Sequence, residues 1–324
     1  MAAEARIEVH LDAEQLRRCL VEDARAGLSS RPKQLAPKWF YDARGSELFE
    51  AITALPEYYP TRTERAILEA AAPEIARALP ADTLVELGSG SGSKTRVLLD
   101  AFLGAGRLRA FVPFDVSEEA LRASVAKLGA DYPDLELTGV VGDFDRHLSC
   151  LPSRGRRLVV FLGGTVGNYP PAQRRDFLAR LAGALRPGEG LLLGTDLVKD
   201  ASRLEAAYND AAGVTAQFNL NVLRVMNRQL GADFDEAAFE HVAFWDADRE
   251  WVEMRLRARA AHRVRLSAIP LEVGFARGEE VRTEISAKFR RRGVEQELAA
   301  AGLELARWWT DPAGDFAVSL SLRR

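Results

Sequence analysis

Hydrophobic and polar positions follow one pattern between residues 61 and 196 and a different one afterwards. In the first region, short continuous apolar runs alternate with segments whose apolar residues recur at helical spacing. The pattern predicts strands at 83–87, 108–114, 137–141, 157–162 and 191–195, and helices at 61–79, 94–103, 117–128 and 172–185. Such an alternation is typical of a parallel sheet with helices on both faces, which right-handed crossovers make doubly wound. Thr61 and Glu64 are predicted to form a capping box at the start of the first helix.

After Asp196 the pattern changes to that of a second domain. Residues 200–230 are expected to form one or two helices, and alternating runs at 242–245, 251–256 and 264–275 then predict an antiparallel meander. A helix at 294–301 and a hairpin of strands at 304–309 and 316–322 are expected to return to the edge of the first sheet. We therefore predict an α/β chain of two interleaved domains. One contains residues 63–197 and 289–324, and the other, an α+β domain, contains residues 1–62 and the insertion 198–288.

Composition narrows the classes of function. The 324 residues carry 44 basic and 47 acidic side chains, a formal net charge of −3, so a broad basic face for nucleic acid is not expected. No apolar run has the length of a membrane span, and residues 1–20 lack the apolar stretch of a secretion signal, so we expect a cytoplasmic protein. The four His and two Cys residues are dispersed and have no metal-ligand spacing. No metal site is expected, and demanding chemistry would then require an organic cofactor.

A glycine-rich segment, Val-Glu-Leu-Gly-Ser-Gly-Ser-Gly-Ser-Lys-Thr, occupies residues 85–95 at the end of the first predicted strand. Glycines at such a place let the backbone turn sharply and a ligand approach closely. A phosphate-binding P-loop requires glycine directly before the Lys-Thr pair, where this chain has Ser93. The dinucleotide pattern G-x-G-x-x-G fails at its third glycine. The segment fits acidic-x-G-x-G-x-G instead, on Glu86, Gly88, Gly90 and Gly92.

Acidic residues also end the next two predicted strands. Asp115 is placed to accept hydrogen bonds from ribose hydroxyls, and Asp143 with Phe144 could hold an adenine ring. Together with the glycine segment, these residues resemble the cofactor motifs of the S-adenosylmethionine-dependent methyltransferases. That cofactor has no phosphates and carries a sulfonium and an ammonium group, which suits acidic strand ends. The alternative is a glycine turn that binds nothing.

A second glycine-containing loop, Gly-Gly-Thr-Val-Gly-Asn-Tyr-Pro at residues 163–170, follows the strand at 157–162. A loop of this kind at the carboxyl edge of a sheet lets a small polar ligand come close, which makes Asn168 a candidate for substrate binding. At this point a plain strand-to-helix turn with Asn168 as a helix cap is an open alternative.

One enzyme family is similar to the chain over about residues 12–324. In chain order, the similarity is carried by PKWFYDARGSELFE, LPEYYPTRTE, VELGSGSGSKTRVLLDAF, PFDVS, GDF, RRLVVFLGGTVGN, LLLGTDLVKD, AAYNDAAGVTAQFN, TEISAKF and WWTDPAGDF. These runs resemble the L-histidine Nα-methyltransferases of ergothioneine biosynthesis. The resemblance implies a Rossmann-like class I methyltransferase sheet with an inserted substrate-binding domain.

The resemblance also implies an activity and a set of contacts. The activity is S-adenosylmethionine-dependent trimethylation of the α-amino group of L-histidine to hercynine, through the mono- and dimethylated forms, by a monomer. The implied cofactor contacts are Gly88, Lys94, Asp115, Asp143 and Phe144, and the loop pattern adds Glu86 and Gly90. The implied histidine contacts are Asn168 and Tyr208 at the head group, and Tyr58, Glu284 and Ser286 at the imidazole. Tyr41 is implied beside the transferred methyl group, so Tyr41 and Asn168 are the candidates for a catalytic role.

The spacing of Glu284 and Ser286 agrees with this role. In an extended segment both side chains point to one face, where a carboxylate and a hydroxyl can bind the N–H and the other nitrogen of an imidazole. Without the resemblance, the charged stretch around them would favour an exposed strand edge. Three alternatives stay open: methylation of another aromatic or imidazole amino acid, a nucleotide hydrolase using the glycine segment with Asp196, and a cofactor sensor without catalysis. The motifs contain no obvious strong base, so we expect solvent or a Tyr hydroxyl to take up the proton of the amine.

Overall fold

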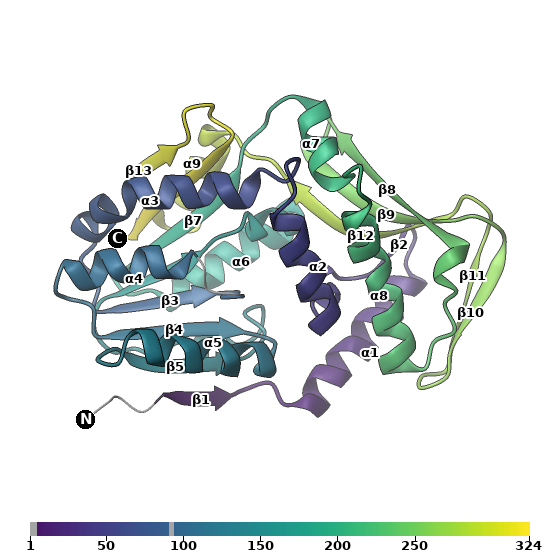
Figure 1. Ribbon diagram of the computed structural model, residues 1–324, viewed down its shortest axis with the longest axis horizontal. Helices are drawn as coiled ribbons and strands as arrows, with labels where there is room; N and C mark the ends of the chain where they lie inside the picture. Colours follow the sequence, from purple (N-terminus) through teal and green to yellow (C-terminus); the bar gives the residue numbers. More distant parts are fainter. Residues whose placement is uncertain (1–4, 91–93) are drawn as a thin grey trace. The chain divides into compact units, whose positions relative to one another are not determined.

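The computed structural model describes residues 5–90 and 94–324, which divide into two compact units (Figure 1). Unit 1 contains the described residues up to Asp12, together with Pro60–Val198 and Phe289–Arg324. Unit 2 contains Ala13–Tyr59 and Lys199–Lys288. Each unit is therefore assembled from segments that are distant in the sequence.

Unit 1 is built on an eight-stranded sheet with the order β1-β5-β4-β3-β6-β7-β14-β13. Its strands are β1 (Arg6–Val9), β3 (Thr83–Leu87), β4 (Ala110–Asp115), β5 (Glu136–Val141), β6 (Arg157–Phe161), β7 (Gly190–Asp196), β13 (Leu303–Thr310) and β14 (Phe316–Arg323). The six strands from β1 to β7 in this order are parallel, and the β13–β14 hairpin adds antiparallel strands beside β7. The chain leaves β3 toward β4 and β5, then returns to β6 on its other side. This reversal is the switch point at which open α/β sheets bind ligands.

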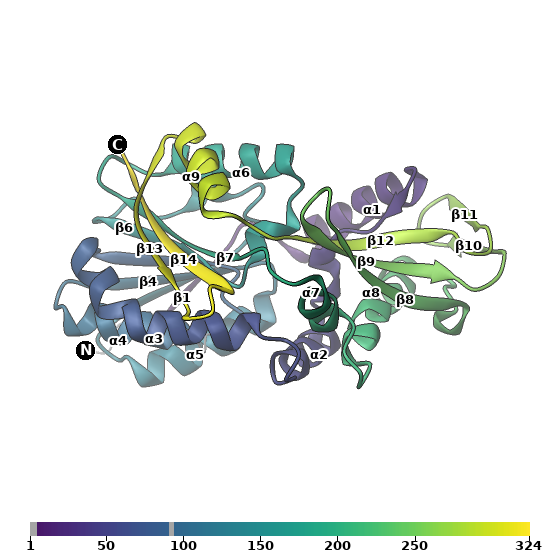
Figure 2. The same ribbon diagram turned by 90° about the horizontal axis from the view of Figure 1, so that it is seen from above.

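Helices cover both faces of this sheet, as the continuous apolar strands predict. They are α3 (Pro60–Ala78), α4 (Thr95–Gly104), α5 (Glu118–Asp131), α6 (Pro171–Ala184) and α9 (Arg291–Ala300). Figure 2 shows α3, α4 and α5 on one face and α6 and α9 on the other. Leu84, Leu99 and Phe111 belong to the core between the sheet and α3, α4 and α5, and each is at most 1% exposed. Ser117 accepts a hydrogen bond from the Ala120 N–H and thereby caps the start of α5.

Unit 2 combines helices with a four-stranded sheet of order β2-β12-β9-β8 and a separate β10–β11 hairpin. The helices are α1 (Ala13–Ser29), α2 (Ala43–Thr53), α7 (Ala201–Tyr208) and α8 (Val214–Leu230), with short 3-10 helices η1 (Pro37–Phe40) and η4 (Glu236–Ala238). The strands are β2 (Lys33–Gln34), β8 (Phe239–Asp246), β9 (Trp251–Ala258), β10 (His262–Leu266), β11 (Leu271–Phe275) and β12 (Glu280–Ala287). The apolar stripe of α8 is buried, with Phe218, Val222 and Met226 each 3% exposed or less.

The structure differs from the sequence-based expectations in three places. The run after Asp196 is not one continuous meander, because β9 pairs with β8 and β12, whereas β10 forms a separate hairpin with β11. Strand β1 pairs with β5 and thus places residues 6–9 in unit 1, whereas the pattern had assigned residues 1–62 to the other domain. The capping box of Thr61 and Glu64 is wrong, since Glu64 is fully buried and its carboxylate binds Gly163 and Lys94. Among the described residues, no helix is long and apolar enough to cross a membrane.

Candidate functional site

A buried acid holds the glycine loop of unit 1 in place through hydrogen bonds. Glu86, the fourth residue of β3, accepts hydrogen bonds from Ser89 Oγ at 2.8 Å and Thr95 Oγ1 at 2.5 Å. Burial raises the pKa of Glu86 to about 7, against the hydrogen bonds from Thr95 and Ser89, which favour ionisation. Because both donors lie in the loop and the first turn of α4, Glu86 ties the loop to the end of β3.

Backbone geometry explains two of the glycines. Gly88 and Gly90 have φ angles of +69° and +49°, a backbone conformation that residues other than glycine rarely adopt. The Gly88 N–H donates to the Phe114 carbonyl at 2.8 Å, and the Gly90 N–H lies 3.4 Å from Asp115 Oδ2. Gly92 and Ser93, the other residues of the predicted pattern, lie outside the described residues.

Asp115 is the last residue of β4 and the Asp143–Phe144 pair follows β5, at the same edge of the sheet. Asp115 Oδ1 accepts the Ser117 N–H at 3.0 Å, and burial raises the pKa of this carboxyl. Asp143 Oδ1 accepts the Asp145 N–H at 2.8 Å. The partly exposed Phe144 ring packs edge-on against Phe161, with centroids 5.5 Å apart. The structure thus brings the predicted strand-end acids and the aromatic ring to one edge of unit 1.

Lys94 has a partner that sequence reasoning missed. Its ammonium forms an ion pair with Glu64, a fully buried carboxylate of α3. The two Glu64 oxygens also lie 2.8 and 2.9 Å from the N–H of Gly163, in the loop after β6. A Cβ on Gly194 would lie 2.0 Å from Glu64 Oε1, so glycine is needed there to make room for the acid. Glu64 therefore connects the start of α4 with the loop that carries Asn168.

Asn168 ends the 3-10 helix η3 (Thr165–Asn168) in that loop and is partly buried. It does not cap α6, whose N-cap position is Pro170 without a side-chain hydrogen bond. The plain cap interpretation of Asn168 is therefore wrong. Its predicted contact with a substrate head group stays a prediction.

The residues of unit 1 fit S-adenosylmethionine better than a nucleoside phosphate. The acids Glu86, Asp115 and Asp143 suit hydroxyl donors and positive charge, and Phe144 offers an aromatic face. Phosphate binding would instead call for a cation, and the loop's lysine already forms an ion pair with Glu64. This arrangement weighs against the nucleotide hydrolase that the sequence left open.

A hydrogen-bonded cluster in unit 2 contains two of the predicted histidine contacts. Tyr208, at the end of α7, donates its hydroxyl hydrogen to Ser286 Oγ at 2.7 Å. The Lys288 ammonium donates to Ser286 Oγ at 2.8 Å and to the Tyr208 hydroxyl oxygen at 3.0 Å. All three side chains are buried. Lys288 was not predicted, although it continues the two-residue spacing of Glu284 and Ser286 directly after the end of β12.

Glu284 lies on β12 with Ser286, and its carboxylate has no hydrogen-bond partner among the residues that the structure describes. Burial raises its pKa to about 7, while the positive charge of Lys288 opposes that rise. The Glu284 side chain is only partly buried, and its carboxylate lacks a hydrogen-bond donor that a ligand could supply. Glu284 is therefore prepared to accept an N–H from a bound molecule.

Aromatic side chains surround the remaining predicted residues of unit 2. The Tyr58 ring lies 6.1 Å from Phe49 and 6.3 Å from Tyr208, centroid to centroid. Tyr41 packs edge-on against Phe49 and Phe218 but is still 38% exposed. Unit 2 therefore joins Tyr58, Tyr208 and Ser286 through contacts, and it places Tyr41 in the same aromatic group.

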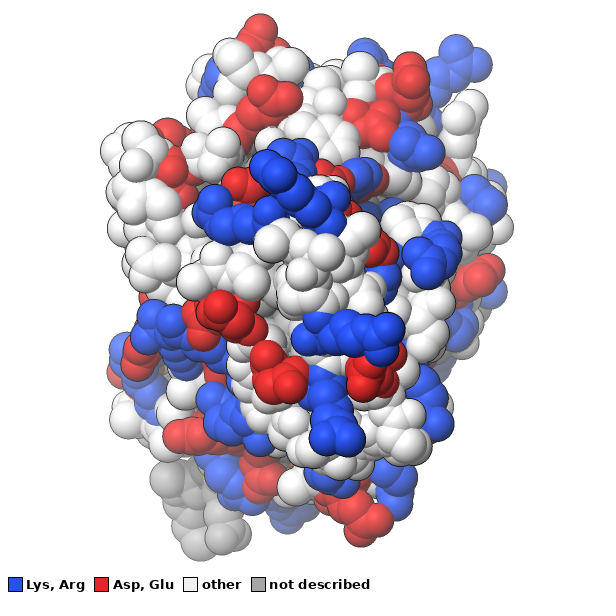
Figure 3. All heavy atoms as spheres, turned by 90° about the vertical axis from the view of Figure 1, so that its right-hand side faces the viewer, with Lys and Arg blue, Asp and Glu red and all other residues white. Residues whose placement is uncertain are grey.

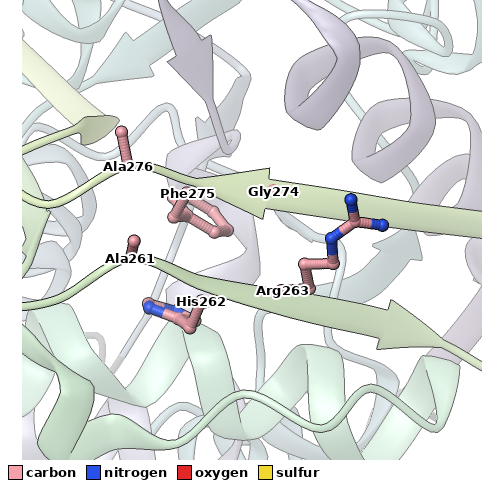
Figure 4. A pocket seen from close by; sticks show the side chains of 6 residues that line it. All are labelled: Ala261, His262, Arg263, Gly274, Phe275 and Ala276. Atoms are coloured by element: carbon pink, nitrogen blue, oxygen red, sulfur yellow. The ribbon is translucent and has the colours of Figure 1, made fainter.

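The surface of unit 2 carries charged side chains and one depression, and none of the predicted residues lines the depression. The view in Figure 3 shows Lys and Arg interspersed with Asp and Glu. An open depression on the β10–β11 hairpin is lined by Ala261, His262, Arg263, Gly274, Phe275 and Ala276 (Figure 4). Within residues 5–90 and 94–324, no three His, Cys, Asp or Glu side chains gather as metal ligands would.

Known proteins are similar to this chain over nearly its whole length. The profile of a family described as "Histidine-specific methyltransferase, SAM-dependent" matches residues 20–323. A histidine N-alpha-methyltransferase of Mycolicibacterium smegmatis is 60% identical over 314 residues, which cover 97% of this chain and 98% of the relative. Its counterpart in Mycobacterium tuberculosis is 56% identical with the same coverage. Ergothioneine biosynthesis protein 1 of Neurospora crassa is 30% identical over 86% of this chain and 32% of its own length.

Proposed function

Because the chain belongs to the family of histidine-specific, S-adenosylmethionine-dependent methyltransferases, we propose that it methylates the α-amino group of L-histidine three times. The product is hercynine, and the reaction is the first step of ergothioneine biosynthesis. The observation that carries the proposal is the Glu284, Ser286 and Tyr208 group in unit 2. The group offers a partly buried carboxylate and a buried hydroxyl to an imidazole, and unit 1 of the same chain supplies the acids for a methyl donor.

Unit 1 supplies the groups for the cofactor. S-adenosylmethionine, when bound, provides a methyl group on a sulfonium that is already an excellent leaving group. Asp115 accepts hydrogen bonds from the ribose hydroxyls, and Asp143 with Phe144 holds the adenine. Glu86 keeps the glycine loop in place, and Lys94, oriented by Glu64, contributes to binding at the start of α4.

Unit 2 and Asn168 supply the groups for the amino acid. Glu284 and Ser286 bind the imidazole together with Tyr58, and Tyr208 and Asn168 hold the head group. The protein must present a neutral amine in line with the methyl group and keep water away, so positioning accounts for most of the rate. Tyr41 orients the amine. The enzyme acts on the mono- and dimethylated forms as well, and we propose that it does so as a cytoplasmic monomer.

The experiment that tests the function uses labelled S-adenosylmethionine and each of the twenty amino acids, with products followed by mass. We expect transfer to histidine alone, with mono-, di- and trimethylated products. Absence of transfer to histidine would refute the proposal, and transfer to another aromatic amino acid would redirect it.

The proton of the amine provides a second test. If a tyrosine hydroxyl relays this proton, Tyr41→Phe or Tyr58→Phe should lower kcat and change its pH dependence. Both variants keep the aromatic packing against Phe49, so their melting temperatures should stay close to that of the wild type. Full turnover by both variants across the pH range would leave solvent as the proton acceptor.

A further inference from the structure

Lys288 is a buried cation that no part of the proposed reaction yet uses. Lys288 is only 4% exposed and directly follows the last residue of β12. Glu284 and Ser286 share a face because they occupy alternate positions of β12, and the hydrogen bond from Lys288 Nζ to Ser286 Oγ adds Lys288 to this row. Burying a lysine is costly unless its ammonium is paired and hydrogen-bonded. The Lys288 ammonium meets this need with the two hydroxyl oxygens of Tyr208 and Ser286.

The direction of these hydrogen bonds follows from the chemistry of the ammonium group. An ammonium donates and cannot accept, so both hydroxyl oxygens act as acceptors toward Lys288. Tyr208 directs its own hydrogen to Ser286 Oγ. The Ser286 oxygen therefore accepts two hydrogen bonds, one from Tyr208 and one from Lys288. A hydroxyl has two acceptor positions, so the remaining function of Ser286 is to donate.

Lys288 also acts on the neighbouring carboxylate. Its charge favours the ionised form of Glu284, against the burial that favours the neutral form. The pKa of Glu284 is raised to about 7, so above that pH the carboxylate is ionised and can only accept hydrogen bonds. The row on β12 thus presents one acceptor, Glu284, and one donor, Ser286.

We propose that Lys288 is a positioning residue of the histidine site, which fixes Ser286 as a donor next to the acceptor Glu284. The matching ligand has one ring N–H and one bare ring nitrogen, which describes the neutral imidazole and excludes the doubly protonated ring. The inference rests on the proposed function and adds to it which protonation state of the side chain is bound.

Ring analogues test the donor role directly. In 3-(pyrrol-2-yl)alanine and 3-(pyrrol-3-yl)alanine, one N–H is kept and the bare nitrogen is replaced by C–H. Each ligand is titrated calorimetrically into the protein saturated with S-adenosylhomocysteine. We expect the wild type to bind histidine at least about tenfold more tightly than the better of the two pyrroles, because a fixed buried donor would be left unpaired.

Lys288→Met removes the constraint on Ser286. The freed hydroxyls of Ser286 and Tyr208 can then satisfy each other in either direction, so the preference for histidine over pyrrole should fall to about threefold or less. Histidine affinity should also fall by about tenfold. Lys288→Arg keeps a donating cation and should retain most of the preference. If Lys288→Met does not fold, Lys288→Gln serves in its place, because an amide can accept as well as donate.

Lys33→Met is the matched control. Lys33 is another buried lysine of unit 2, 5% exposed, and it pairs with Glu279 and lies 5.0 Å from the centre of the Phe275 ring. Its replacement should lower stability without changing the histidine-to-pyrrole ratio. An unchanged ratio in Lys288→Met, or an equal change in Lys33→Met, would overturn the proposal. If the wild-type protein does not methylate histidine, the proposed function itself is refuted. The failure of this proposal and the failure of the proposed function can therefore be told apart.

Discussion

Burial raises the pKa of Glu284 to about 7, and this has a consequence for stability. The unfolded chain loses the proton near the ordinary value of 4.5, whereas the folded protein keeps it up to about pH 7. In that window the folded state binds more protons, so Glu284 lowers the free energy of unfolding as the pH rises. Glutamine mimics the protonated form. Glu284→Gln should therefore be about 1–3 kcal/mol more stable than the wild type at pH 8, with a smaller difference at pH 5.

Glu280→Gln, on the same strand, should have the opposite effect. Burial tends to raise the pKa of Glu280, but hydrogen bonds and charges from Arg255 and Arg257 hold it below its ordinary value. Its stabilising contribution is present at pH 8 and is lost as the pH falls through the lowered pKa. Denaturant unfolding at pH 5 and pH 8 measures both variants. A loss of stability in Glu284→Gln at pH 8 would contradict the assigned environment of this acid.

The same substitution should separate the two ligands. Glu284→Gln loses a charge-assisted hydrogen bond to the imidazole, and we expect histidine to bind about 10–100-fold more weakly. Cofactor affinity should stay unchanged, because the acids proposed for it belong to unit 1. Calorimetric titration of each ligand provides the comparison. Equal loss of both affinities would show that Glu284 does not act on histidine.

For single residues, the sequence predicted a role where the residue belongs to a recognisable motif. Glu86, Asp115 and Asp143 follow apolar strands, and the structure brings them to one edge. Glu64 could not be found in this way, because Thr-Glu spacing before a helical run looks like a capping box while its actual partners are 30 and 99 residues away. Lys288 left a usable signal, since it extends the alternation of Glu284 and Ser286 by one step.

At the scale of elements, Gly194 shows how tightly α3 and β7 are fitted together. An alanine Cβ at this position would lie 2.0 Å from Glu64 Oε1, a distance that no packed side chain tolerates. Gly194→Ala should displace the Glu64 carboxylate from Gly163 and Lys94 and lower the free energy of unfolding by about 2–4 kcal/mol. Weaker cofactor binding should accompany this loss.

Gly183→Ala is the control for that prediction. Gly183 lies in α6, and an added Cβ there would have no heavy atom within 4 Å. Alanine favours a helix over glycine by up to about 1 kcal/mol, so this variant should be as stable as the wild type or more so. Thermal unfolding of the two variants side by side is decisive: similar melting temperatures would mean that Glu64 can move away at little cost.

The positions of the strands could be predicted most accurately where the strands are most deeply buried. Strands β3, β6 and β7 are buried at every position and read as continuous apolar runs, so they were located to within a residue. Strand β1 has only four residues, Arg-Ile-Glu-Val, and is mostly exposed, so its alternation of polar and apolar residues covers just two periods and is a weak signal. The partner of β9 was also beyond reach, because sequence order favours the neighbouring β10 and only tertiary packing selects β12.

At the scale of the molecule, the insertion after β7 was visible because the hydrophobic pattern changes there, but the division of the N-terminal region was not. The chain passes from one unit to the other after Asp12, Tyr59, Val198 and Lys288. The first of these crossings depends on β1, whose four residues do not indicate by themselves that their partner is β5. A discontinuous unit of this kind is specified by strand pairing rather than by any one segment.

This division predicts how two ligands would protect the backbone from hydrogen exchange. S-adenosylhomocysteine should slow exchange in the described loops of unit 1 after β3, β4 and β5, where its contacts are proposed. Histidine, added to the protein already saturated with that ligand, should slow exchange in β12 and at the end of α7, because the proposed contacts Glu284, Ser286 and Tyr208 lie there. The experiment is peptide-resolved exchange followed by mass spectrometry, with Glu284→Gln as the control that should lose only the second effect. Protection by histidine confined to unit 1 would show that unit 2 is not its binding domain.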